Sequence, residues 1–86
     1  MDTRYWTQKT TRHFHMPDQT TRLITLTNCH WGAYDHIIST GLFTPEKLIE
    51  MALNDASILG ISFEEMLADG IAHIDSELAR SEHGPV

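Results

Sequence analysis

Three features that often indicate a protein's compartment are scarce in this chain or absent from it: cysteine, long apolar runs and an apolar N-terminal segment. Cys29 is the single cysteine among 86 residues, so an internal disulfide is excluded and a reducing compartment is favoured. No apolar run reaches the roughly 18 residues that a membrane-spanning helix needs. The N-terminal stretch MDTRYWTQKTTRHFH has no apolar core of the kind found in signal peptides. We therefore expect a cytoplasmic protein that does not enter a membrane.

Cations are also scarce, and they are unevenly placed. Six Lys and Arg residues stand against twelve Asp and Glu residues, which gives a net charge of −6. Residues 1–22 carry four of the cations and two carboxylates, whereas residues 23–86 carry two cations and ten carboxylates. This asymmetry is typical of a basic arm that meets an anionic partner, and equally of a solubilising tail.

The length allows one domain with a thin hydrophobic core, which a partner surface would enlarge. Residues 1–19 show no apolar period, so we expect a flexible basic arm there. Residues 21–27, TRLITLT, are rich in β-branched residues and leucine. Their alternation predicts a strand with Ile24 and Leu26 on one face and Leu23 among threonines on the other.

The period changes after the strand. Asn28 or Thr27 suits a helix N-cap, and apolar residues from Trp31 to Ile38 follow at helical spacing. We expect a helix over 29–40. The alternative is a β-hairpin over 22–39, with its turn at NCHWG, which would give an α+β fold of ββαα order.

Two further helices have clearer boundaries. Thr44 as N-cap and Pro45 at the first helical position begin one helix, which Gly60 ends. Ser62 and Glu65 form a capping box at the start of the next. The expected domain covers residues 20–80, and residues 81–86 form a frayed tail.

The predicted fold is therefore mainly α, with one N-terminal β-strand followed by three helices. A lone strand leaves its backbone donors and acceptors unpaired. Pairing with the same strand of a second copy is the simplest remedy, so we expect a homodimer formed through residues 21–27.

This order of elements resembles the ribbon-helix-helix family of DNA-binding proteins over about residues 20–60. Three groups of residues carry the resemblance: Ile24 and Leu26 on the strand, Trp31, Tyr34 and Ile37 on the first helix, and Leu48, Ile49 and Ala52 after TPEKLIEMAL begins the second. The resemblance implies a dimeric regulator of transcription that reads DNA with a pair of strands. The outward strand residues would enter the major groove, and amides at the start of the second helix would hold a phosphate.

The resemblance and the positions of the cations together give the expected DNA-binding residues: Thr21, Arg22, Leu23, Thr25, Thr44, Lys47, Lys9 and Arg12. Threonine can hydrogen-bond base edges and touch a thymine methyl. The acidic body departs from the family, because cations supply most of the non-specific affinity for DNA.

The acidic helices support an alternative function. They can present a negative surface to a basic, nucleic-acid-handling protein, which would make the chain a small protein-interaction module such as an inhibitor or adaptor. Cys29 and the histidines have no recognised metal-ligand spacing, and no acid–base or nucleophile constellation is present. We therefore expect no enzyme activity, no metal site and no cofactor.

Overall fold

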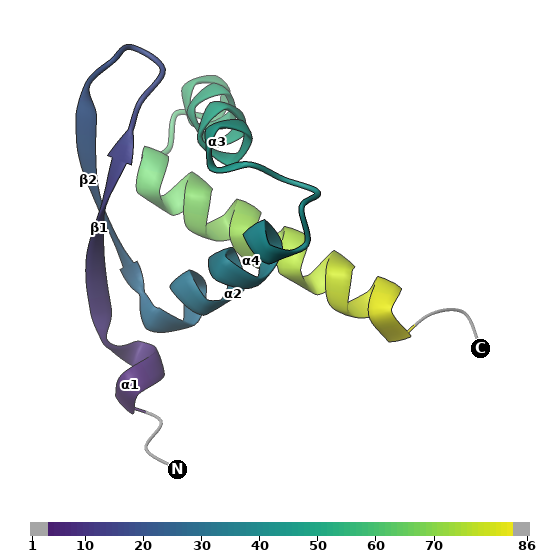
Figure 1. Cartoon of the computed structure of the whole chain (residues 1–86). Helices are drawn as coiled ribbons and strands as arrows, with labels where there is room; N and C mark the ends of the chain where they lie inside the picture. The colour runs from purple at the N-terminus through teal and green to yellow at the C-terminus, as the bar shows by residue number, and fades with distance from the viewer. Residues whose placement is uncertain (1–3, 84–86) are drawn as a thin grey trace.

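A two-stranded antiparallel hairpin stands along one side of a group of helices in the computed structural model, which describes residues 4–83 (Figure 1). The elements in chain order are α1 (Arg4–Thr7), β1 (Lys9–His15), β2 (Thr21–Thr27), α2 (Asn28–Ser39), α3 (Pro45–Leu59) and α4 (Phe63–His83). Helices α2 and α3 both pack against α4. The fold is a hairpin followed by three long helices, with a short helix before it.

Strand β1 was not expected. The prediction of a flexible arm over residues 1–19 is wrong for residues 4–7, which form α1, and for residues 9–15, which pair with β2 from Lys9 opposite Thr27 to His15 opposite Thr21. The prediction of a single strand is wrong for the same reason. Phe14 accounts for the order in this segment, since its side chain is buried in the core with 8% of its area exposed.

The junction between strand and helix formed as predicted, and of the two predicted caps it is Thr27 that caps the helix. The helix over 29–40 is confirmed as α2, Asn28–Ser39, so the alternative hairpin over 22–39 is wrong. Thr27 is the N-cap, and its side chain accepts from the His30 amide. Asn28 is instead buried, where its side chain accepts from the Thr10 hydroxyl and donates to the Tyr5 carbonyl. These bonds satisfy a polar group that would be costly to bury alone.

Aromatic side chains join the hairpin to α2. The Phe14 ring stacks on Trp31 with ring centroids 5.7 Å apart, and Tyr34 meets both rings edge-on. The Trp31 indole N–H donates to the Thr10 carbonyl over 2.7 Å. Ile24 and Ile37 complete this part of the core and are fully buried.

The caps of the later helices match the sequence. Thr44 accepts from the Lys47 amide at the start of α3, and Ser62 accepts from the Glu65 amide at the start of α4. Gly60 ends α3 with a φ of +71°, a conformation that favours glycine. Helix α4 continues to His83, three residues past the predicted end of the domain at residue 80, and residues 84–86 of the predicted frayed tail lie outside the described residues.

None of the helices in the described part of the chain combines the length and the apolar character needed to cross a membrane.

Candidate protein-binding groove

The outer face of the hairpin carries three of the residues predicted to contact DNA. Thr21, Leu23 and Thr25 are exposed on the side of β2 that faces away from the helices, and Leu23 has 58% of its area exposed. Their neighbours across the hairpin are His15, His13 and Thr11 in that order. The predicted outward direction of these side chains agrees with the structure.

The two predicted arginines of the hairpin, Arg12 and Arg22, contact the helices and do not lie on this outer face. The Arg12 guanidinium donates two hydrogen bonds to the Asp35 carboxylate, at 2.8 and 3.0 Å, and lies 4.6 Å from the centre of the Trp31 ring. The bond to Arg12 lowers the pKa of Asp35, and the same bond raises the pKa of Arg12. The Arg22 guanidinium lies 4.6 Å from the centre of the Phe63 ring. Both arginines thus lean toward the helices, and Lys9 is the remaining hairpin cation among those predicted.

Thr44 and Lys47 lie apart from the hairpin face, at the start of α3. Because the Thr44 side chain already accepts from the Lys47 amide, one of the amides predicted to hold a phosphate has a partner within the helix. The structure therefore places the predicted DNA-binding residues on three surfaces: the outer face of the hairpin, its helix-facing side and the first turn of α3.

Both edges of β2 have hydrogen-bond partners within the chain. One edge pairs with β1, and on the other the Thr25 amide donates to the Glu64 carboxylate of α4 over 2.9 Å. The homodimer was predicted because a lone strand lacks a partner. That premise is wrong, since β1 supplies the partner strand.

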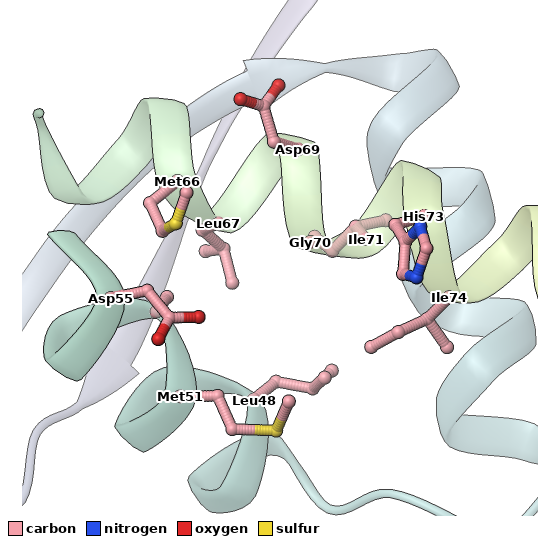
Figure 2. Close-up of a pocket in the computed structure, with 11 residues that line it drawn as sticks. Leu48, Met51, Asp55, Met66, Leu67, Asp69, Gly70, Ile71, His73 and Ile74 are labelled. Carbon is pink, nitrogen blue, oxygen red and sulfur yellow. The ribbon is translucent and has the colours of Figure 1, made fainter. Parts of the chain in front are cut away.

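A mainly apolar depression lies between α3 and α4, and we call it the α3–α4 groove. Its volume is about 230 Å³. The apolar residues that line it are Leu48, Met51, Ala52, Met66, Leu67, Ile71 and Ile74. Figure 2 shows Met51 and Leu48 on α3 across from Met66 and Leu67 on α4. Met51 has 38% of its area exposed, so part of this apolar surface faces solvent.

Two carboxylate residues line the groove, and Figure 2 shows that their side chains differ in direction: Asp55 points toward the space between the helices, whereas Asp69 points away from α3. Asp55 belongs to α3 and Asp69 to α4, and His73 lies further along α4 (Figure 2). Neither carboxylate has an ion-pair partner among the described residues. Residues 45–83 hold nine carboxylates against Lys47 and Arg80. The groove therefore combines an apolar floor with a negative surround.

Gly70 lines the groove at its centre. A Cβ atom added to Gly70 would have no heavy atom within 4 Å, so this glycine does not serve a close approach of α3 to α4. The absent side chain leaves open space over the floor instead.

Sequence reasoning missed this groove. At helical spacing, Leu48, Met51, Ala52, Ala56 and Leu59 of α3 form one apolar stripe, yet Met51 and Leu59 are exposed in the structure. The presence of Met51 on one helix, and of Met66 close to Gly70 on the next, was the signal in the sequence that could have indicated a binding groove, because methionine is common at adaptable binding surfaces. The sequence does not show that Met51 and Met66 face each other, because this arrangement depends on how α3 packs against α4.

No group of three or more His, Cys, Asp or Glu side chains suited to a metal ion occurs within residues 4–83. The comparisons with known proteins found no matching family model, no matching curated protein and no matching solved structure.

Proposed function

We propose that the protein is a small interaction module that binds a cationic amphipathic helix of a partner protein in the α3–α4 groove. The observation that carries this proposal is an apolar floor exposed between two helices, with the unpaired carboxylate of Asp55 directed toward it (Figure 2). Helix-in-groove recognition uses this combination: apolar anchors enter the groove, while side chains at its border set charge preference.

The chemistry of the partner follows from the groove. Apolar anchors spaced three and four residues apart on the partner helix would contact Met51 and Met66, whose flexible side chains adapt to different anchors. Lysine or arginine beside those anchors would lie near Asp55. A partner that handles nucleic acid has suitable basic helices.

The test is calorimetric titration of the full chain with a helical peptide that has leucine anchors on one face and lysines beside them. A second peptide has glutamate in place of every lysine. We expect the cationic peptide to bind, with affinity that falls as salt is raised, and the acidic peptide to bind at least tenfold more weakly. Equal affinity for the two peptides, or no binding of either, would contradict the proposal.

Carboxylate variants sharpen this test. Asp55→Asn should weaken binding of the cationic peptide and flatten its salt dependence. Glu77→Gln is the matched control, since Glu77 lies on α4 outside the groove and contacts Arg80 at 3.6 Å. An equal effect from the control would mean that overall charge, rather than the groove, attracts the peptide.

DNA binding by the outer face of the hairpin is the second candidate function. The observation that favours it is the exposure of Thr21, Leu23 and Thr25 on a two-stranded ribbon, an element that fits the major groove. It ranks second because Arg12 and Arg22 are engaged on the helix side. Titration with duplex DNA at low salt distinguishes the two candidates: salt-sensitive binding that Leu23→Glu abolishes would favour DNA.

A further inference from the structure

The outer edge of β1 lies beside two adjoining hollows between the hairpin and the start of α3. One has a volume of about 320 Å³ and includes Arg12, His13 and Phe14, and the other has about 270 Å³ and includes Met16. Both are lined by His15, Glu46 and Ile49. Because they share these residues, the two hollows lie next to each other, and together we call them the β1 channel.

The hydrogen-bonding pattern of the hairpin shows which backbone groups face this channel. The Asn28 amide donates to the Gln8 carbonyl, and the Met16 amide donates to the Thr20 carbonyl. These bonds fix the even-numbered residues of β1 as the ones bonded to β2, because bonded and non-bonded pairs alternate in an antiparallel ladder. The Thr25 amide, which points away from β1 to Glu64, agrees with this alternation.

The amide and carbonyl groups of Thr11, His13 and His15 consequently point away from β2. Within the described part of the chain, no hydrogen-bond partner occurs for these outward groups. The two edges of the hairpin therefore differ: β2 has Glu64 against it, whereas β1 presents an open row of donors and acceptors next to a depression. An open edge of this kind is a template for another strand.

The side chains of the channel indicate what kind of strand fits. Phe14 and Ile49 are buried and give an apolar floor, while Glu46 and Glu50 are exposed on α3. Neither glutamate has an ion-pair partner among residues 4–83. A strand added to β1 directs alternate side chains toward the helices. An apolar side chain over Phe14 and a cationic one, two residues away, near Glu46 match this surface.

We infer that the β1 channel is a second binding site, which takes an extended peptide segment of a partner as a third strand beside β1, with an apolar and a lysine or arginine side chain facing α3. Main-chain bonds to His13 and His15 would supply affinity, and the two inward side chains would supply specificity. This site is separate from the α3–α4 groove and does not depend on a helical ligand.

The test uses the capped peptide TKTVTKT and the full chain labelled with ¹⁵N. The sequence is the same in both directions, so one lysine meets Glu46 and Glu50 whichever way the strand runs. We expect chemical-shift changes concentrated at residues 11–16 and 46–50, and slower hydrogen exchange of the His13 and His15 amides. Changes confined to the α3–α4 groove, or no saturable changes, would overturn the inference.

N-methylated peptides test the main-chain bonds directly. One peptide is methylated on its threonine amides and the other on its lysine and valine amides. Because only every second amide of a strand faces its neighbour, one peptide should bind roughly tenfold or more weakly and the other should keep its affinity. Equal affinity of both for the protein would exclude strand addition.

A variant of the protein tests the same main-chain hydrogen bonds by changing β1 instead of the peptide. His13→Pro removes an outward amide and leaves the bonds between β1 and β2 in place, a position that edge strands tolerate. It should bind TKTVTKT about tenfold more weakly, whereas His13→Ala, which keeps the amide, should bind within about twofold of the native chain. Shifts at residues 11–16 that depend on protein concentration without peptide would show a second copy in the channel, and would overturn the peptide assignment.

Discussion

Single residues of the hairpin divide sharply between core and solvent. Leu23 and Ile24 are neighbours in β2, yet Leu23 is 58% exposed and Ile24 is fully buried. The alternation of a strand explains this difference, because successive side chains point to opposite faces. The sequence pattern predicted it correctly for β2.

Substitution by arginine makes this division measurable. Leu23→Arg should change the free energy of unfolding by less than about 0.5 kcal/mol, since the side chain stays in solvent. Ile24→Arg should destabilise the protein by about 3 kcal/mol or more, because it removes core packing and buries a charge. Urea denaturation followed by circular dichroism checks both, and a large loss in Leu23→Arg would show that the outer face is covered.

Gly70 and Gly60 offer a second contrast at this scale. Gly70→Ala should raise the free energy of unfolding by about 1 kcal/mol, because alanine favours the helix and its Cβ meets only open space. Gly60→Ala should lower it by roughly 1 kcal/mol, since Gly60 has a φ of +71°. Thermal melts of the two variants should move in opposite directions. A destabilised Gly70→Ala would mean that the groove is closed in solution.

At the scale of elements, the sequence predicted β2, α2, α3 and α4 but neither α1 nor β1. The four predicted elements have a clear apolar period or a cap such as Thr44 or Ser62. In β1, KTTRHFH, only Phe14 is apolar, so its alternation of buried and exposed residues has almost no hydrophobic signature. Its order comes instead from contacts distant in sequence: the ladder with β2, the stacking of Phe14 on Trp31 and the bond from Arg12 to Asp35.

The ion pair between β1 and α2 should make stability depend on pH. Arg12 lowers the pKa of Asp35 in the folded state, so the pair stabilises the fold above the ordinary aspartate pKa and its contribution is lost as pH falls through the lower, folded value. The difference in urea midpoint between the native chain and Asp35→Asn should therefore persist from neutral pH to about pH 4 and shrink below it. A difference of the same size at pH 7 and pH 3 would exclude this linkage.

The whole molecule has opposite charge tendencies in its two parts. Residues 1–22 hold four of the six cations, and residues 45–83 hold nine of the twelve carboxylates. The sequence predicted this division and the acidic surface, but not the site. The groove depends on how α3 lies against α4, and that placement also decides that Met51 is exposed while Ile49 is buried.

The proposed function rests on occupancy of the α3–α4 groove, and filling that groove tests it most directly. Gly70→Leu places a side chain in the open space at its centre, whereas Ala72→Leu adds a leucine to an exposed position of the same helix outside the groove. Calorimetric titration with the cationic amphipathic peptide should show that Gly70→Leu binds at least tenfold more weakly than the native chain while Ala72→Leu binds as the native chain does. Unchanged affinity in a folded Gly70→Leu variant would contradict the account.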